Sequence, residues 1–264
     1  MLKFAVNLSM LFQDLPLKER FERAGKCGFK AVELLWPYEL SIPEFKVLLE
    51  AHHLKLALFN TRAGEISKGE WGLAALPGRE SEARAHIDEA LEYAAGLDCP
   101  TVHVMAGVVK GLDRERCFET LKENVAYACE KAAPHGITIT LEALCPAVKE
   151  NYLYKSQYDT LQVVKDLNLS NLKVQYDFYH AQLVDGNVTG FLTENIASIG
   201  HVQIASVPDR TEFNHGELDG AYCLQLLEKL HYQGYIGLEY RKGVLGDEDS
   251  SAFAYLLNSP LAME

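Results

Sequence analysis

The chain has 264 residues, of which 48% are hydrophobic, and its formal net charge at pH 7 is −12. This length suits one (β/α)8 barrel or two smaller domains, and the apolar fraction is sufficient for a large core. Nucleic acids and anionic membrane surfaces bind clustered Lys and Arg, so the acidic balance argues against both as partners. No apolar run approaches the roughly 18 residues of a membrane span.

The chain begins at once with a strand-like pattern, so we expect no signal peptide. Its six cysteines are scattered, without a Cys-x-x-Cys pair, at Cys27, Cys99, Cys117, Cys129, Cys145 and Cys223. A disulfide framework is not expected in a chain this long, and the spacing does not suit a zinc ribbon. We therefore expect small buried hydrophobic side chains in a protein of the reducing cytoplasm.

Short apolar runs alternate with longer amphipathic stretches, which is typical of βα units and a parallel sheet. We expect eight strands at residues 4–8, 31–35, 54–59, 101–105, 137–142, 172–177, 201–205 and 234–239. We expect helices at residues 16–27, 43–53, 79–96, 113–135, 156–167, 187–198 and 219–231. Eight units are the number that a closed (β/α)8 TIM barrel needs, and we expect one such domain over residues 1–264. An open doubly wound sheet is the alternative, but it would want a glycine-rich phosphate turn that this sequence lacks.

Two stretches fall outside this alternation. Residues 61–78 contain four glycines and Trp71, and a long irregular loop in a compact domain is usually functional or disordered. Because its Trp and Leu content argues against disorder, we expect an ordered lid. The tail from Gly246 onward is acidic and then apolar, and we expect it to form a closing helix.

Four of the later expected strands carry an oxygen-bearing side chain at or near the C-terminal end, namely Glu142, Asp177, Gln203 and Glu239. In a barrel these strand ends meet at the face that carries the active site. Three carboxylates in one barrel mouth would repel one another strongly without a cation. Because all four donors are hard oxygens, the set suits Mg²⁺ or Mn²⁺ rather than Zn²⁺. The alternative is that each residue is an ordinary solvated strand terminus.

Further polar residues follow other strands and could bind a substrate: Asn7, Glu33, Asn60, His103, Lys155, His180 and Arg210. His180 could donate a hydrogen bond into the site. Arg210 could hold an organic carboxylate, because its planar fork binds both oxygens, and Lys155 could do the same. Glu33 and Trp36 could line the pocket. The competing interpretation for each is a satisfied core residue or a surface residue.

These residues carry a resemblance to a known family. The matching stretches cover nearly the whole chain in order, and they are residues 4–9, 58–60, 69–80, 102–107, 177–182, 201–205 and 237–240. They include Gly69-Glu70-Trp71-Gly72-Leu73 and Asp177-Phe178-Tyr179-His180. The chain resembles the hydroxypyruvate isomerase family within the xylose-isomerase-like TIM barrels, and it is also similar to the 2-oxo-tetronate isomerases.

The resemblance implies a role for each strand-end residue. Glu142 and Glu239 match the paired proton donor and acceptor of the family, which are also metal ligands. Asp177 and Gln203 match the remaining ligands. In the related sugar epimerases a histidine stands at the Gln203 position, and this departure leaves the metal preference open. Asn7, His103, Lys155, His180 and Arg210 remain the candidates for substrate binding.

The resemblance also implies a reaction. A small hydroxy-oxo acid would be isomerised by proton transfer through an enediolate, with hydroxypyruvate giving 2-hydroxy-3-oxopropanoate (tartronate semialdehyde). This chemistry needs a divalent metal such as Mg²⁺ or Mn²⁺ and no nucleotide cofactor, in keeping with the missing nucleotide fingerprint. The expected partner is the small-molecule substrate alone, and a homo-oligomer is compatible with the sequence.

Three alternatives keep the barrel but change the function. The substrate could be a four-carbon 2-oxo acid or a free ketose, the latter making the chain an epimerase. A barrel endonuclease would want a His-rich zinc site and a basic groove, whereas the nine histidines are dispersed and the net charge is −12. A non-catalytic barrel that senses a sugar acid would not need both Glu142 and Glu239 at strand ends.

Overall fold

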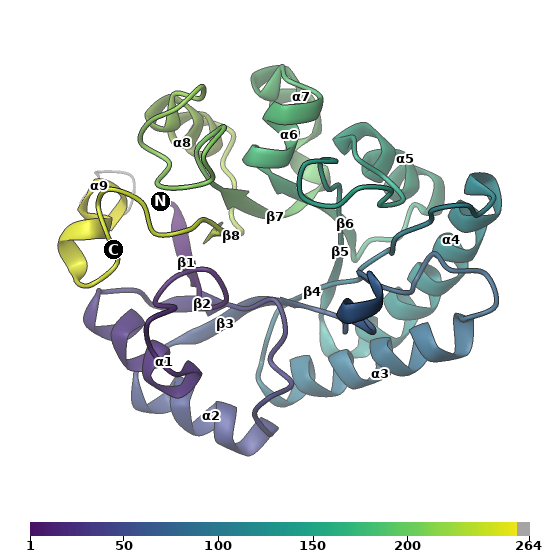
Figure 1. The fold of residues 1–264 in the computed structure, drawn as a ribbon, viewed down its shortest axis with the longest axis horizontal. Helices are drawn as coiled ribbons and strands as arrows, with labels where there is room; N and C mark the ends of the chain where they lie inside the picture. Colours follow the sequence, from purple (N-terminus) through teal and green to yellow (C-terminus); the bar gives the residue numbers. More distant parts are fainter. Residues whose placement is uncertain (258–264) are drawn as a thin grey trace. The chain divides into compact units, whose positions relative to one another are not determined.

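The computed structural model describes residues 1–257. Its eight strands are paired in parallel and follow one another around a closed barrel in sequence order (Figure 1). They are β1 Lys3–Asn7, β2 Ala31–Glu33, β3 Lys55–Asn60, β4 Thr101–His103, β5 Thr138–Glu142, β6 Leu172–Asp177, β7 Ile199–Ile204 and β8 Tyr235–Leu238. The predicted (β/α)8 fold is therefore confirmed, and the open sheet is excluded.

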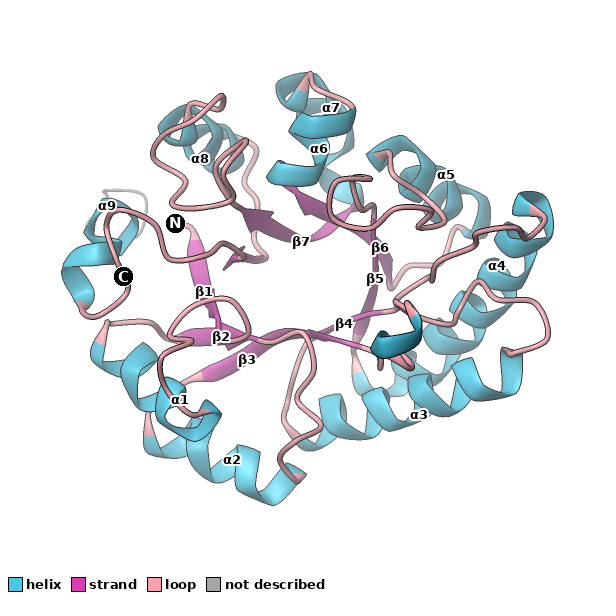
Figure 2. Ribbon diagram, in the orientation of Figure 1, coloured by secondary structure: helices cyan, strands magenta, loops and turns pink. Residues whose placement is uncertain are grey.

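Helices follow the strands, as Figure 2 shows in cyan. They are α1 Leu17–Lys26, α2 Ile42–Ala51, α3 Glu80–Gly96, α4 Arg114–Ala132, α5 Gln157–Leu167, α6 Phe178–Val184, α7 Val188–Asn195, α8 Gly220–Lys229 and α9 Ala254–Leu257. Among the described residues, no helix combines the length and the apolar character that crossing a membrane requires.

The chain forms two compact units that alternate along the sequence. Unit 1 contains Met1–Ala57, Asp177–Ala197 and the chain from His201 onward, and unit 2 contains Leu58–Tyr176 and Ser198–Gly200. In unit 1, β1 pairs with β2 on one side and β8 on the other, and β7 pairs with β8. In unit 2, the strand order is β3, β4, β5 and β6. A single domain over the whole chain stays a prediction.

Local sequence explains where several helices begin. Asp113, Ser156 and Asp219 each accept a hydrogen bond from a backbone N–H in the first turn of α4, α5 and α8. These caps satisfy donors that a helix leaves without intrahelical partners. Pro16 immediately precedes α1, and Gly28, just beyond its end, has a φ of +95° that favours glycine.

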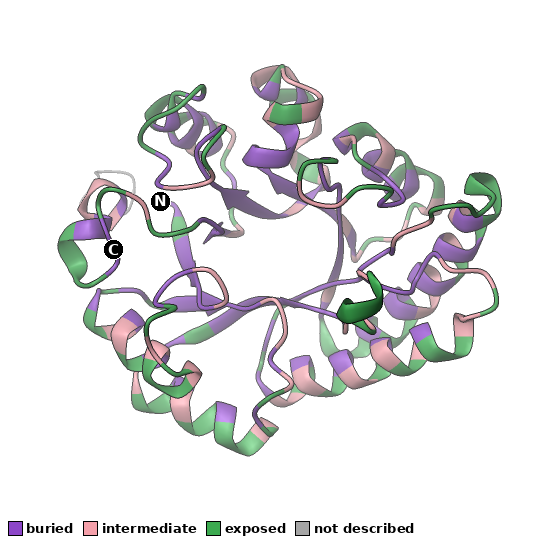
Figure 3. Cartoon of the chain, viewed as in Figure 1, coloured by how far each residue is buried: buried purple, intermediate pink, exposed green. Residues whose placement is uncertain are grey.

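Burial follows the predicted patterns within each unit. In unit 2, α3 packs beside α4, and its buried face includes Ile87, Leu91 and Ala94. The other side of α3 is exposed, and the strands are almost wholly buried (Figure 3). Strands buried on both faces are typical of a parallel sheet covered by helices. All six cysteines are buried and free, as expected.

Two parts of the structure differ from the sequence-based expectation. Helix α6 was not predicted, because Asp177 ends β6 and also caps α6, leaving no loop between the two elements. The predicted closing helix appears as a 3₁₀ turn, Ser250–Phe253, followed by α9. The remainder of that prediction, residues 258–264, lies outside the described residues.

Candidate active site

Two buried carboxylates and one arginine of unit 1 meet where β6 and β8 end. Asp177 is the last residue of β6, and Glu239 directly follows β8. The Nη2 atom of Arg210 lies 3.3 Å from Asp177 Oδ2 and 3.0 Å from Glu239 Oε2. The sequence placed Arg210 in the loop after strand seven. Its two partners are distant in sequence, since Asp177 is 33 residues and Glu239 is 29 residues from Arg210.

The loop after β7 fixes the position of Arg210. Its backbone N–H donates to the Ser206 carbonyl at 2.9 Å, and its own carbonyl accepts from the Arg241 N–H at 2.9 Å. The guanidinium carbon lies 4.9 Å from the centre of the Tyr179 ring, a cation–π arrangement. The arginine is therefore held both by its backbone and by an aromatic face.

The electrostatics of this cluster follow from burial. Burial raises the pKa of Glu239 to about 8; the nearby Arg210 opposes this rise, while the charges of Asp177 and Glu33 add to it. Burial also raises the pKa of Asp177, again against the effect of Arg210. His180 Nε2 lies 3.4 Å from Asp177 Oδ2, yet burial, and then Arg210, lower its pKa well below the usual value. The imidazole of His180 is therefore neutral at pH 7.

The side-chain amide of Gln203, on β7, is oriented by its hydrogen bond to Glu33. Its amide nitrogen donates to Glu33 Oε1 at 2.9 Å, so its carbonyl oxygen lies on the opposite side of the amide group from that bond. Asp177, Glu239 and Gln203 therefore supply carboxylate and amide oxygens from one unit. This donor chemistry fits Mg²⁺ or Mn²⁺.

The fourth predicted ligand, Glu142, ends β5 in unit 2 and is buried. His103, the last residue of β4, places its Nδ1 atom 3.5 Å from Glu142 Oε2 and 3.2 Å from Asn60 Oδ1. Because both neighbours are acceptors, the proton of a neutral His103 belongs on Nδ1. His103 thus contacts a predicted proton-transfer residue directly.

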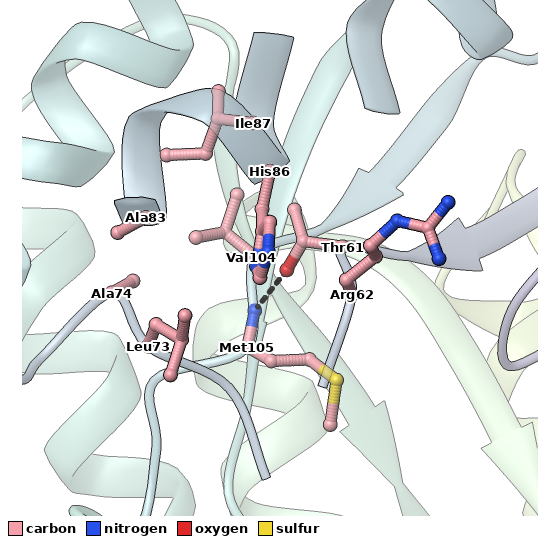
Figure 4. A pocket seen from close by; sticks show the side chains of 9 residues that line it. All are labelled: Thr61, Arg62, Leu73, Ala74, Ala83, His86, Ile87, Val104 and Met105. Carbon is pink, nitrogen blue, oxygen red and sulfur yellow. Dashed lines mark hydrogen bonds between the residues drawn. The ribbon is translucent and has the colours of Figure 1, made fainter. Parts of the chain in front are cut away.

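Residues 61–78 are anchored in unit 2 at two places. Gly72 bridges to Ala106, and Ala75 donates its N–H to the Ala106 carbonyl at 2.8 Å. Near the start of the segment, Thr61 Oγ1 accepts from the Met105 N–H at 3.1 Å, beside a gap too narrow for a water molecule (Figure 4).

Between these anchors, residues 64–71 include a short 3₁₀ helix, Ile66–Lys68, with exposed residues. An ion pair between Glu70 and Arg79 links this tip to the residue before α3. Lys149 lies 4.3 Å from the centre of the Trp71 ring. A lid over residues 61–78 stays a prediction.

The remaining predicted residues are placed differently. Asn7 is buried, and its amide is used on both sides, since Nδ2 donates to Glu33 and Oδ1 accepts from the Ser9 N–H. Lys155 is exposed in the loop after β5. Substrate binding by Asn7 and Lys155 stays a prediction, and the position of neither residue supports it further.

Glu33 and His201 are the residues whose importance sequence reasoning underestimated. Glu33 ends β2, has no exposed surface, and lies at the centre of a hydrogen-bonded group. The signal that singled out Glu142 and Glu239, a carboxylate closing a short apolar strand, was also present at Glu33. His201 lies inside an expected strand, and no pattern in the sequence distinguishes it from the other strand residues.

Comparison with known proteins agrees with this architecture. The family model described as xylose isomerase-like TIM barrel matches residues 21–255. The 2-oxo-tetronate isomerase of Haemophilus influenzae is 51% identical over 240 residues, which cover 90% of this chain and 93% of that protein. The hydroxypyruvate isomerase of Escherichia coli is 36% identical over 242 residues, covering 91% and 94% of the two chains.

A solved structure is also similar over its full length. The crystal structure named as an AP endonuclease of family 2 from Brucella melitensis has a TM-score of 0.93 and 41% identity, with 98% of each chain covered. The family model and the relatives each span most of the chain. The chain therefore belongs to the xylose isomerase-like TIM barrel family.

Proposed function

We propose that this chain is an isomerase that moves the carbonyl group of a small hydroxy-oxo acid between neighbouring carbons. The observation that carries the proposal is the placement of two buried glutamates, Glu142 and Glu239, at the C-terminal ends of β5 and β8. Buried carboxylates at barrel strand ends are suited to proton transfer, and this is the end at which barrel enzymes act. Relatives named as isomerases, 36% to 51% identical, support the same reaction class.

The preferred substrate is a four-carbon 2-oxo acid. Three relatives named 2-oxo-tetronate isomerase are 44% to 51% identical to the chain, whereas those named hydroxypyruvate isomerase are 36% to 40% identical. Hydroxypyruvate, the three-carbon acid that the sequence favoured, is the second candidate. In both acids a carbonyl at C2 lies next to a hydroxyl-bearing C3, so the same proton transfer serves either one.

We also propose a single divalent cation, Mg²⁺ or Mn²⁺, held by Glu142, Asp177, Gln203 and Glu239. Two features of unit 1 support it. Asp177 and Glu239 are buried carboxylates that share the guanidinium group of Arg210, and the orientation of the Gln203 amide turns its oxygen away from Glu33. A bound cation of this kind would act as a Lewis acid toward carbonyl and hydroxyl oxygens.

The protein groups then have distinct tasks. One glutamate takes the proton from C3, and a proton is returned to C2 by the other carboxyl group, while a hydroxyl proton passes from the C3 oxygen to the C2 oxygen. Atoms and electrons balance within the substrate, so no electron acceptor is needed. Neutral His180 can donate an N–H to a substrate oxygen, and Arg210 can bind the substrate carboxylate.

Two further assignments complete the proposal. The tip of the segment, residues 64–71, would cover the bound substrate and exclude water from the reacting carbons. Six buried, free cysteines suit the reducing cytoplasm as the place of action.

Proton NMR in D₂O tests the reaction directly. The purified chain is incubated with 2-oxo-tetronate or hydroxypyruvate, with Mn²⁺ or with EDTA, and the product is then separated from manganese before spectra are recorded. We expect deuterium at C2 of the product, faster turnover of the four-carbon acid, and no reaction with EDTA. If neither acid reacts under any metal condition, the proposed reaction class is wrong.

A further inference from the structure

Glu33, a buried carboxylate at the end of β2, accepts three hydrogen bonds in unit 1. Glu33 Oε1 lies 2.9 Å from Asn7 Nδ2 and 2.9 Å from Gln203 Nε2. Its other oxygen, Oε2, lies 2.7 Å from His201 Nε2. Glu33 has no exposed surface, and the three partners are each about 1% exposed, so the whole group is shielded from solvent.

An ionised carboxylate can only accept hydrogen bonds, so each facing nitrogen must carry a proton. This requirement fixes the orientation of two side-chain amides, Asn7 and Gln203, and places the proton of a neutral His201 on Nε2. If the Gln203 amide were turned over, its oxygen would face the Glu33 carboxylate, and two acceptors would be in contact. The buried charge therefore selects one of the two orientations of Gln203.

The backbone of β8 leaves space for this carboxylate. A Cβ atom added at Gly237 would overlap the carboxylate of Glu33 itself. Gly237 pairs with Gln203 on β7 and with Ala5 on β1, so it lies next to the residue whose amide Glu33 holds. Glycine at this position of β8 therefore leaves the space that the Glu33 carboxylate occupies.

We propose that Glu33 is a positioning residue that turns the Gln203 carbonyl oxygen toward the divalent cation. The inference rests on the proposed cation site, and it extends that site to a group that touches neither substrate nor metal. Glu33 acts through Gln203: its charge holds the amide nitrogen on its own side, so that the oxygen lies on the other side of the amide group. Partners of this kind typically orient metal ligands, and their loss costs about 10–100-fold in metal affinity.

The first test is the isosteric change Glu33→Gln, with Mn²⁺ affinity measured by electron paramagnetic resonance and by calorimetry. An amide at position 33 presents one acceptor and one donor, so it no longer selects the orientation of Gln203. We expect Mn²⁺ affinity to fall about 10–100-fold while the far-ultraviolet circular dichroism stays that of the parent. An unchanged affinity would overturn the inference.

Asp247→Asn is the matched control, because Asp247 is also a buried carboxylate of unit 1 and accepts from the Phe12 N–H at 2.6 Å. The inference predicts Mn²⁺ affinity within about threefold of the parent for this variant. An equal loss in both variants would show a general effect of removing buried charge, and would contradict the specific role of Glu33.

A charge swap separates positioning from simple structural support. In the double variant Glu33→Gln with Gln203→Glu, residue 203 offers oxygens on both sides and the amide at 33 can donate to it. Mn²⁺ affinity should recover to within about threefold of the parent, because no amide orientation remains to be selected. If the double variant binds Mn²⁺ as weakly as Glu33→Gln alone, Glu33 does not act by positioning Gln203.

The outcomes also distinguish this inference from the proposed function. If the parent chain itself binds no Mn²⁺, the cation site is wrong. If the parent binds Mn²⁺ and Glu33→Gln binds it equally well, the site stands and only the role given to Glu33 fails.

Discussion

Replacing Gly72 by alanine should destabilise this chain far more than replacing Gly69 by alanine, although both glycines lie in the same segment. Gly72 has a φ of +102°, and a Cβ atom added there would lie 2.5 Å from the backbone carbon and from the Cβ of Met105. Gly69 has a φ of +86°, but no described atom lies within 4 Å of an added Cβ. The comparison therefore separates steric conflict from backbone strain.

The magnitude follows from these two terms. A non-glycine residue held in a sparsely populated conformation costs about 1–3 kcal/mol. Forcing an extra methyl group against packed neighbours costs about 1–3 kcal/mol more. For Gly72→Ala the sum is about 4 kcal/mol, or a fall in Tm of about 8–16 °C for a domain of this size. For Gly69→Ala only the strain remains, about 2 kcal/mol, or about 4–8 °C.

Differential scanning calorimetry of the parent and the two variants measures this difference, and steady-state kinetics at 20 °C show whether the folded variants stay active. Gly72→Ala should also lower kcat, because the bridge from Gly72 to Ala106 anchors the segment that we propose as the lid. Equal shifts in Tm for the two variants would contradict this prediction, since they would mean that the contact with Met105 has no energetic cost.

Three further predictions concern the site. Glu142→Gln and Glu239→Gln should each lower kcat about 10²–10⁴-fold with the fold retained by circular dichroism, and kcat within a few-fold of the parent would remove that glutamate from proton transfer. Arg210→Ala should lower kcat/KM about 10–100-fold on the acid substrate but much less on an uncharged ketose, and equal losses would argue against a carboxylate clamp. Burial raises the pKa of Glu239 from 4.5 to about 8, so its contribution to stability is complete below pH 4.5 and is lost as pH rises through about 8. In EDTA, Glu239→Gln should therefore gain Tm relative to the parent between about pH 5 and pH 9, and a constant difference would contradict the raised pKa.

Much of the barrel could be predicted because the signal is local. Each strand is a short apolar run, and Asp113, Ser156 and Asp219 stand where helices need a capping side chain. The ends of the strands were predicted less accurately. Strand β4, for example, ends at His103, two residues before the predicted end. Helix α6 was missed because Asp177 is the last residue of β6 and also the N-cap of α6. The sequence around Asp177 indicates a strand end and a candidate metal ligand, but not a helix cap.

The contacts of the candidate site depend on distant pairs, which a single sequence does not reveal. Strand-end position identified Asp177 and Glu239 as neighbours at one face, but not that Arg210 would lie between them. Likewise, Glu33 and His201 are 168 residues apart, and only the closed strand order brings them together. The residue types at strand ends were predictable, whereas the hydrogen bonds that orient them were not.

Mn²⁺ titration of the chelator-treated chain and of four alanine variants tests whether one cation is shared by Glu142, Asp177, Gln203 and Glu239. We expect one Mn²⁺ per parent chain and an affinity lower by at least about 10–100-fold in every variant, because even the loss of a group that only orients a metal ligand costs this much. Full Mn²⁺ affinity in the Glu142 variant would contradict this expectation, because the residue at the end of β5 would then have no part in the cation site.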